Sequence, residues 1–202
     1  MNKETKIKSL PYKQHKQYRL PGYDYSAMGD YFITICTKNR AHHFGKITKG
    51  KNNPFIELSA IGLFVNDCIQ SIPATYVGVT LGETVVMPNH IHLIITLPLK
   101  EIKVPVQQSA MQQLISPKRG LVPLTAGSVS SIINHLKGKV KKWCKANEYD
   151  EFEWQSRFHD HIIRNNNAYN RIANYIHNNV HNWKEDENND GGYRFRKDIR
   201  IT

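Results

Sequence analysis

The chain is organised around one stretch, Met87-Pro88-Asn89-His90-Ile91-His92-Leu93-Ile94-Ile95-Thr96-Leu97. Successive residues of a strand point to opposite faces, so odd-numbered positions line one face and even-numbered positions the other. Apart from Asn89, the odd-numbered face is apolar and is typical of a strand that faces the core. The other face places His90 and His92 side by side, and a neutral imidazole is the commonest metal-binding side chain. The stretch predicts a strand with a core face and a candidate metal-binding face.

Other interpretations of the histidines remain open. The pair can equally be two satisfied polar residues on an exposed strand face. A second His-x-His, His159-Asp160-His161, is a rival metal site, although it lacks the clean apolar alternation. His177 and His181 are four residues apart on a predicted helix and point away from its apolar stripe, which favours solvent as their neighbour. Ile94 stands where a nucleotide-hydrolase triad of alternating histidines needs its third histidine, so that triad is excluded.

Charge narrows the class of partner. The 202 residues carry 28 Lys+Arg against 17 Asp+Glu, a net charge of +11 with a pI near 9.6. This balance suits a polyanion, and nucleic acid leads over an acidic membrane because the chain has no long apolar run and no basic amphipathic anchor. An ordinary basic protein without a charged partner is the alternative.

Cysteine usage and the start of the chain indicate the compartment. The three cysteines, Cys36, Cys68 and Cys144, are scattered and odd in number, which predicts reduced core residues and not a disulfide framework. The first residues lack the apolar segment of a secretory signal. We therefore expect a cytoplasmic, nucleoid-associated protein.

The first half of the pattern alternates strands and a helix. Residues 31–37 and 44–48 predict strands, the second one weaker, and a turn-rich segment follows at 50–54. Ser59 is a good N-cap for a helix that we expect Pro73 to end. A strand at 79–86 then leads through a tight turn into the histidine strand. This order is half of an α+β sandwich.

The second half begins after a long aperiodic segment, residues 98–126, which is typical of a functional or disordered loop. Ser128 is expected to cap a second helix with an apolar stripe on one side and lysines, Lys137 among them, on the other. Residues 151–154 and 161–163 predict a short final strand region. Asn165 or Asn166 is expected to cap a third helix that runs to about His181.

One apolar stripe of the third helix contains an anomaly. The stripe consists of Ala168, Ile172, Tyr175, Ile176, Asn179 and Trp183. A buried asparagine needs hydrogen bonds or a metal, and Asn179 lies one turn beyond Tyr175 on the same side. If the stripe packs across the histidine face, the Asn179 amide oxygen and both imidazoles could hold one ion beside Tyr175. The alternatives are Tyr175 as a core ring and Asn179 as a helix C-cap.

Residues 1–25 form a predicted basic arm, in which Lys13, Lys16 and Arg19 are interleaved with tyrosines. Such an arm could lie along a single nucleic-acid strand, with the basic groups on phosphates and the rings on bases, or be a solvated tail. Residues 26–183 are expected to form one catalytic domain. Residues 184–202 are expected to be a C-terminal tail.

Several motifs resemble a known family. They are Tyr23-Asp24-Tyr25-Ser26 leading to Tyr31-Phe32-Ile33-Thr34-Ile35-Cys36-Thr37, Met87-Pro88-Asn89-His90-Ile91-His92, Trp154-Gln155-Ser156-Arg157-Phe158, and Asp160-His161-Ile162-Ile163-Arg164-Asn165 followed by Tyr175-Ile176-His177-Asn178-Asn179. Over residues 20–183 the chain resembles the REP-associated tyrosine transposases of the single-tyrosine HUH superfamily. The resemblance implies a ferredoxin-like α+β fold, an antiparallel sheet with helices on one face and the tyrosine helix near the histidine face.

The resemblance also implies roles for individual residues. His90 and His92 match the family's metal ligands, Asn179 matches a third ligand, and Tyr175 matches the nucleophile. The family commonly has proline after this asparagine, where the present chain has Val180, so the end of the helix is less sharply defined.

These roles predict a metal-dependent single-stranded DNA endonuclease and strand transferase, which forms a 5′-phosphotyrosine intermediate on hairpin-containing DNA. The mixed nitrogen and oxygen ligands suit Mg²⁺ or Mn²⁺. The expected DNA contacts are Lys13, Lys16, Arg19, Lys137, Arg157 and Arg164. A homodimer is a further expectation, and no membrane is expected as a partner. The alternatives are a catalytically silent single-strand-binding module and an HUH replication initiator or relaxase.

Overall fold

The computed structural model of the protein describes residue 20 and residues 22–99, 125–186 and 188–189. Three of the predicted DNA contacts, Lys13, Lys16 and Arg19, lie outside these residues. So do most of the aperiodic 98–126 segment and most of the C-terminal tail. The DNA contacts of the basic arm therefore stay predictions.

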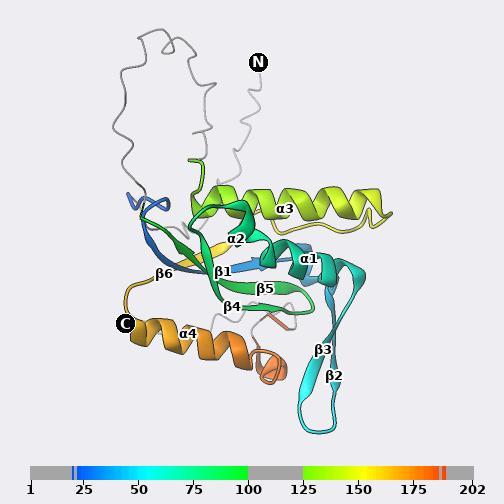
Figure 1. Ribbon diagram of the computed structural model, residues 1–202. Coiled ribbons are helices and arrows are strands. Elements are labelled where there is room, and N and C mark those ends of the chain that lie inside the picture. Colours follow the sequence, from blue (N-terminus) through cyan, green and yellow to red (C-terminus); the bar gives the residue numbers. More distant parts are fainter. Residues whose placement is uncertain (1–19, 21, 100–124, 187, 190–202) are drawn as a thin grey trace, which may run out of the picture.

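A four-stranded antiparallel sheet forms the centre of the molecule (Figure 1). Its strands, in spatial order, are β4 (Thr80–Val86), β5 (His90–Leu97), β1 (Gly29–Cys36) and β6 (His159–Ile163). The histidine strand β5 pairs with β4 on one side and with β1 on the other. As an inner strand it can be covered on both faces, which is the first condition for burying its imidazoles.

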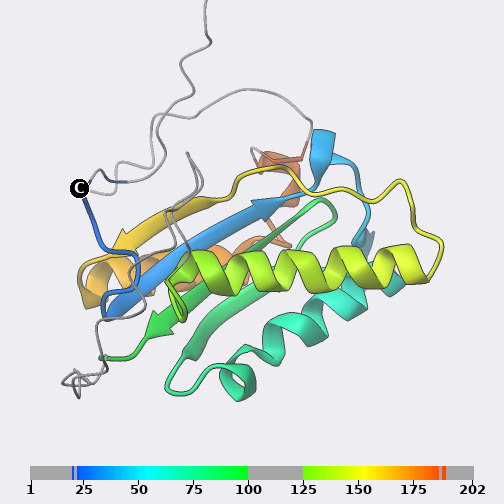
Figure 2. The same cartoon turned by 90° about the horizontal axis from the view of Figure 1, so that it is seen from above.

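Helices cover both faces of the sheet. The helices α1 (Ala60–Gln70) and α3 (Val129–Ala146) lie on one face, and α4 (Asn166–Asn178) lies on the other (Figures 1 and 2). The order β1-α1-β4-β5-α3-β6 is the split β-α-β arrangement of ferredoxin-like folds. The α+β class and the position of the tyrosine helix on the histidine face are confirmed.

The predicted start of each helix is confirmed by a side chain that accepts a backbone hydrogen bond. The Ser59 hydroxyl accepts from the Gly62 N–H at 3.1 Å, and the Ser128 hydroxyl accepts from the Ser131 N–H at 3.3 Å. Asn165, not Asn166, caps α4, since its Oδ1 accepts from the Ala168 N–H at 2.8 Å. Each cap satisfies one of the N–H groups that a helix start leaves unpaired.

Several predicted boundaries were wrong. Pro73 does not end the first helix, which ends at Gln70, because it lies in the first turn of the short helix α2 (Ile72–Thr75), where a missing N–H costs nothing. The third helix ends at Asn178, before the predicted His181. Of the predicted final strand region, residues 161–163 lie in the strand β6, whereas in 151–154 only Trp154 pairs, through an isolated bridge to Thr37.

A strand was also missed. Residues 50–53 form the turn of a hairpin between β2 (Gly45–Lys49) and β3 (Pro54–Leu58). The run of glycine, asparagine and proline correctly indicated a turn. Pro54 nevertheless begins β3, because the first residue of a strand can lack a backbone N–H donor. This hairpin forms a separate two-stranded sheet.

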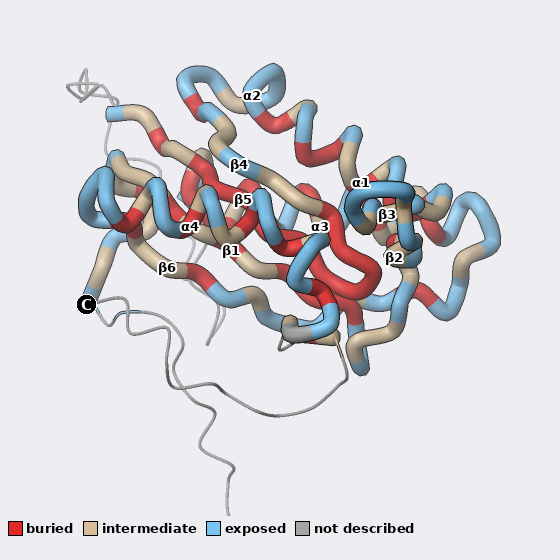
Figure 3. The backbone as a smooth tube through the Cα atoms, turned by 90° about the horizontal axis from the view of Figure 1, so that it is seen from below, coloured by how far each residue is buried: buried red, intermediate tan, exposed pale blue. Residues whose placement is uncertain are grey.

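The core has two layers, one on each face of the sheet, and the centre of the sheet between them is buried (Figure 3). Ile91, Leu93 and Ile95 are fully buried against α1 and α3, whereas Ile94 is buried against Ile172 and Ile176 of α4. Burying one such side chain contributes about 1.5–3 kcal/mol. β5 is therefore covered on both faces, and an exposed strand face for its histidines is wrong.

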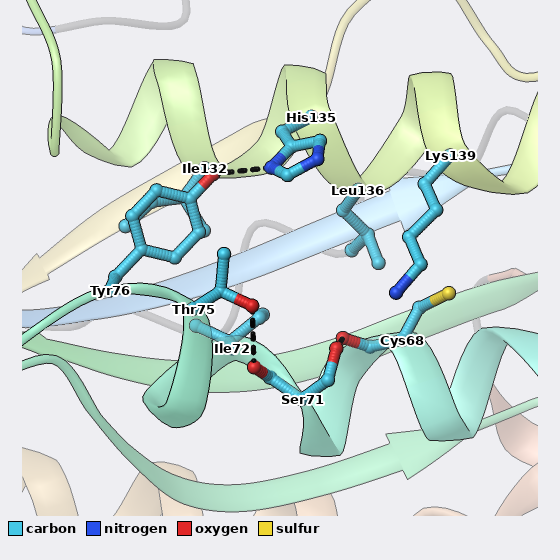
Figure 4. Close-up of a pocket in the computed structure, with 9 residues that line it drawn as sticks. All are labelled: Cys68, Ser71, Ile72, Thr75, Tyr76, Ile132, His135, Leu136 and Lys139. Atoms are coloured by element: carbon cyan, nitrogen blue, oxygen red, sulfur yellow. Dashed lines mark hydrogen bonds between the residues drawn. The ribbon is translucent and has the colours of Figure 1, made fainter.

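A hollow lies on the face of the sheet away from the β5 histidines, between α1, α2 and α3 (Figure 4). The Tyr76 hydroxyl lies 2.7 Å from His135 Nδ1 and closes one end of the hollow, and Cys68 and Lys139 line the other end.

Among the described residues, every helix is too short or too polar to serve as a membrane span.

Candidate metal and nucleophile site

The two histidines at the start of β5 are buried and converge on one space. Their exposed fractions are 0% for His90 and 2% for His92, and their ring centroids are 4.5 Å apart. His92 Nδ1 is 2.8 Å from the Thr34 hydroxyl, and His90 Nδ1 is 2.9 Å from Asn89 Oδ1. Because each Nδ1 is held by a neighbour, each ring is fixed so that it presents Nε2, as metal-binding histidines typically do.

Tyr175 faces this space from α4. Its hydroxyl is 3.4 Å from His92 Nε2, and the two ring centroids are 5.4 Å apart. The Phe32 ring packs against both, at 5.2 Å from His92 and 6.2 Å from Tyr175. The buried Ile172 and Ile176 hold the helix on the sheet. The tyrosine is thus positioned by packing on a rigid helix, with its hydroxyl beside an imidazole.

Asn179 comes to the same space from the end of α4. It occupies the C-cap position, so the C-cap interpretation is confirmed, yet its side chain is buried with 2% exposed. Its Nδ2 donates to Asp186 Oδ2 at 3.0 Å. Within the part of the chain that the structure describes, Asn179 Oδ1 and His90 Nε2 are buried without a hydrogen-bond partner. An unsatisfied buried polar group costs about 1–3 kcal/mol, so both atoms indicate a ligand.

Asp186 is the site residue that sequence reasoning missed. Ligand atoms of His90, His92 and Asp186 all lie within 4.8 Å of one another, close enough to hold one metal ion. The acidic run around Asp186 read as a solvated tail, because charged runs usually are. The signal that could have found it was Trp183, since a large aromatic residue beyond the helix indicates that packing continues.

Side-chain contacts fasten the segment after α4 over the histidines. The Trp183 ring, in the turn η2 (Trp183–Glu185), stacks near His90 with 6.1 Å between centroids. Asn89 Nδ2 donates to the Asn188 carbonyl at 2.7 Å and to the Arg40 carbonyl at 3.1 Å. The Arg40 guanidinium in turn donates to Asn188 Oδ1. Asn89, the polar exception in the apolar pattern, thus connects three segments around the site.

Burial sets the charge state of both imidazoles. Desolvation, with smaller contributions from Arg40 and His42, lowers the pKa of His90 to about 3. Desolvation and then the neighbouring His90 hold the pKa of His92 well below its ordinary value. Both rings are therefore neutral at pH 7, which is the form that binds metal.

The donor atoms fit a divalent cation. Two neutral imidazole nitrogens, the Asn179 amide oxygen and the Asp186 carboxylate make a mixed nitrogen and oxygen set, which suits Mn²⁺ and admits Mg²⁺. Of the residues covered by the structure, His90, His92 and Asp186 are the one group of three or more histidine, cysteine or acidic side chains placed for an ion. The identity of the metal stays a prediction.

The rival histidines lie elsewhere. Thr34 of β1 pairs with His92 on one side and with His159 of β6 on the other. His159 is therefore on the same face as His92 but two strands away, about 10 Å. His161 pairs with Phe32, two residues from Thr34 along β1. His177 and His181 are exposed, as their spacing predicts.

The described DNA-contact candidates are spread over the surface. Lys137 is on α3, across the sheet from the histidines, and its Nζ donates to the carbonyls of Gln155 and Ser156 at 2.7 and 3.3 Å. Arg157 and Arg164 are exposed just before and just after β6. Lys137 thus holds the segment that contains Arg157. Contact of any of the three with DNA stays a prediction.

Metal binding should depend little on pH near neutrality. Two ordinary histidines with a pKa of about 6.5 would lose roughly tenfold in affinity between about pH 7.5 and pH 6, since protons compete for both nitrogens. Because both pKa values here are depressed, we expect Mn²⁺ affinity, measured by titration calorimetry, to change less than about threefold over that range. A tenfold loss would contradict the buried, neutral pair.

The same depressed pKa values set the direction of acid sensitivity. The stability contributed by the neutral histidines is fully present above the unfolded pKa of about 6.5 and is lost as the pH falls toward the folded value of about 3 for His90. The affected window lies below pH 6.5 for the metal-free protein, because the unfolded chain binds protons there that the folded histidines do not.

Comparison with known proteins identifies relatives. No protein-family model matches the chain. An uncharacterized protein of Haemophilus influenzae is 35% identical over 176 residues, which cover 85% of this chain and 91% of that protein. Among solved structures, a REP-associated tyrosine transposase bound to a REP hairpin is similar, with a TM-score of 0.50 and 21% identity over 79% of this chain and 69% of that one. At that identity the likeness shows a common fold.

A second solved structure, of a candidate transposase from Deinococcus radiodurans, has a TM-score of 0.39 and 15% identity. Its likeness covers 79% of this chain and 95% of that one, and is too distant to support an argument.

Proposed function

The chain belongs to the family of the Haemophilus influenzae protein and has the fold of a REP-associated tyrosine transposase, and from this we propose that it is a metal-dependent tyrosine transposase of the HUH type. In this proposal it nicks and rejoins single-stranded DNA through a 5′-phosphotyrosine bond at Tyr175. The observation that supports it most is the tyrosine hydroxyl 3.4 Å from His92 Nε2, beside two buried ligand atoms without partners.

The chemistry follows from the position of Tyr175. Its phenol oxygen attacks the scissile phosphorus and loses its proton, while the bond from phosphorus to the leaving 3′-oxygen breaks and that oxygen gains a proton. The bond energy is kept in the phosphotyrosine, so a 3′-hydroxyl can reverse the step and join strands. Phe32, packed against the Tyr175 ring, limits its rotation and keeps the hydroxyl directed at the site.

His90, His92, Asn179 and Asp186 would hold the metal. When bound, a divalent ion neutralises charge on the scissile phosphate and favours the ionised phenol, whose ordinary pKa is about 10. Thr34 and Asn89 fix the orientation of the imidazoles through their Nδ1 atoms. These contacts keep the imidazoles in place before an ion binds, so binding requires little further ordering of the side chains.

Single-stranded DNA beside a short stem is the proposed substrate. The net charge of +11 suits a polyanion, and the transposase of the same fold is bound to a REP hairpin. An unpaired strand suits this site, because the histidines are buried on an inner strand and the Tyr175 ring packs on Phe32 and His92, which leaves little room for a duplex at the hydroxyl.

Asp186→Asn tests whether the missed carboxylate is a ligand. Removing its charge while keeping its shape should lower Mn²⁺ affinity by about tenfold or more. Asp67→Asn, an exposed change of the same kind on α1, should leave the affinity unchanged. Calorimetry measures both. Equal affinity for the two variants would show that Asp186 only orients Asn179.

A covalent adduct is the direct test of the proposed function. The protein is incubated with end-labelled stem–loop DNA that carries a single-stranded foot, with Mn²⁺ or EDTA, and run on a denaturing gel. We expect a protein–DNA adduct in the presence of Mn²⁺ and none in EDTA. Metal binding without an adduct on any such DNA would favour a catalytically silent single-strand-binding module instead.

A further inference from the structure

The β2–β3 hairpin stands apart from the two packed layers. It leaves the body beside α1 and projects on the same side of the sheet as α4 and η2 (Figure 1). Seen from that side, its strands are largely exposed or half-exposed, in contrast to the buried centre of the sheet (Figure 3). A two-stranded hairpin is marginally stable by itself. It therefore adds little to the stability of the core.

The base of the hairpin is fixed to the turn that leads into the histidines. The Phe44 N–H donates to the Pro88 carbonyl at 2.9 Å, and the Ser59 N–H donates to the Phe44 carbonyl at 2.9 Å. A Cβ at Gly62 would lie 2.0 Å from the Phe44 oxygen, so only glycine lets α1 approach this closely. Because Pro88 is two residues before His90, the hairpin is rigidly placed next to the candidate site.

The exposed surface of the hairpin is basic and has one aromatic ring. Lys46, Lys49 and Lys51 are exposed, against the single acidic residue Glu57, which pairs with Lys46 at 3.1 Å. Lys49 precedes the turn and Lys51 lies within it. Phe55 leaves 50% of its surface exposed, although it lies in a strand. Positive groups and an exposed ring on one hairpin are typical of nucleic-acid contacts.

We infer that the β2–β3 hairpin contacts the paired stem of a DNA hairpin whose unpaired foot lies in the site. This rests on the proposed function, because it is attack by Tyr175 that places the unpaired foot in the site and directs the stem away from it. A two-stranded ribbon fits the major groove, which is about 12 Å wide. Five-residue strands reach about 17 Å, enough to follow a stem away from the site. Lys49 and Lys51, at the turn end of the hairpin, meet phosphates of the stem, and Phe55, next to that end, packs in its groove.

A second copy of the chain is the other partner that the hairpin could bind. Charge argues against it: a hairpin with three lysines and one glutamate would approach a molecule of net charge +11. Repulsion of like charges opposes that contact, whereas a stem with two phosphates for each base pair attracts it. Nucleic acid is therefore the occupant we propose.

The test measures binding without cleavage. Fluorescence anisotropy in EDTA follows two probes, a stem–loop with its single-stranded foot and the foot alone. Lys49→Gln/Lys51→Gln should bind the stem–loop roughly tenfold or more weaker, with the salt slope smaller by about 1.8, since each duplex phosphate contact contributes about 0.9. It should bind the foot alone like the wild type. Phe55→Ala should weaken stem–loop binding at an unchanged salt slope.

The matched control is Lys142→Gln/Lys145→Gln, the same charge change on exposed lysines of α3 across the sheet, which should bind both probes like the wild type. Equal losses in the two double variants, an unchanged affinity in the hairpin variant, or a wild type without affinity for the stem–loop would overturn the inference. So would hairpin variants that change the oligomeric state in sedimentation.

The outcomes separate this inference from the proposed function. If the wild type forms no adduct but stem–loop binding depends on Lys49 and Lys51, the transposase chemistry fails and the hairpin contact stands. If the adduct forms and the hairpin variants bind like the wild type, the opposite holds.

Discussion

Tyr175→Phe should form no covalent adduct with DNA, whereas we expect the wild type to trap the 5′-phosphate. The change removes the attacking oxygen and keeps the ring that packs on Phe32 and His92. The lost contact to His92 Nε2 is long, 3.4 Å, so its removal should change the free energy of unfolding by less than about 1.5 kcal/mol. Mn²⁺ affinity should also stay near that of the wild type, as calorimetry would show.

The control for this variant is Tyr169→Phe. Tyr169 is on the same helix, but its hydroxyl lies against β4, only 2.3 Å from where a Cβ at Gly82 would be. Burial also raises the pKa of Tyr169, which makes it a poorer nucleophile. Tyr193, another tyrosine of the C-terminal part, lies outside the described residues. Mass spectrometry that finds the phosphotyrosyl peptide at Tyr169 or Tyr193, or an adduct in Tyr175→Phe, would remove Tyr175 from its role.

Removal of either β5 histidine should abolish metal-dependent cleavage. His90→Ala and His92→Ala each delete a candidate ligand at the centre of the cluster, so Mn²⁺ affinity should fall more than about 100-fold, beyond the loss expected from changing a residue that only orients a ligand. His159→Ala, on the same face two strands away, should bind Mn²⁺ like the wild type. Loss of affinity in His159→Ala alone would move the site to the β6 histidines.

Burial complicates these variants, because both imidazoles are buried and alanine leaves a cavity at either position. Such a cavity should destabilise the metal-free protein by about 1–3 kcal/mol. His92→Gln keeps more of the volume and can still accept from the Thr34 hydroxyl, while its amide is a poor metal ligand. A folded His92→Gln protein, checked by circular dichroism, that retains full Mn²⁺ affinity would exclude His92 as a ligand.

The sequence by itself determined the local elements. Alternation along 87–97 predicted the two faces of β5, because side-chain direction in a strand depends only on the backbone period. Ser59, Ser128 and Asn165 marked where helices begin, since a cap is satisfied within four residues. The placement of Tyr175 and Asn179 on one side of α4 followed from the helical repeat in the same way.

Other features depended on contacts between distant segments. Asp186 reaches the site through long-range hydrogen bonds: the amide of Asn89, 97 positions earlier, donates to the Asn188 carbonyl, and the Asn179 amide donates to Asp186 itself. The strand β3 exists because β2 pairs with it, against the local preference of its proline and turn residues. Hydrogen bonds and burial that join residues far apart in the chain leave no periodic signal, so the tertiary structure alone decided which side chains close the site and which hairpin stands beside it.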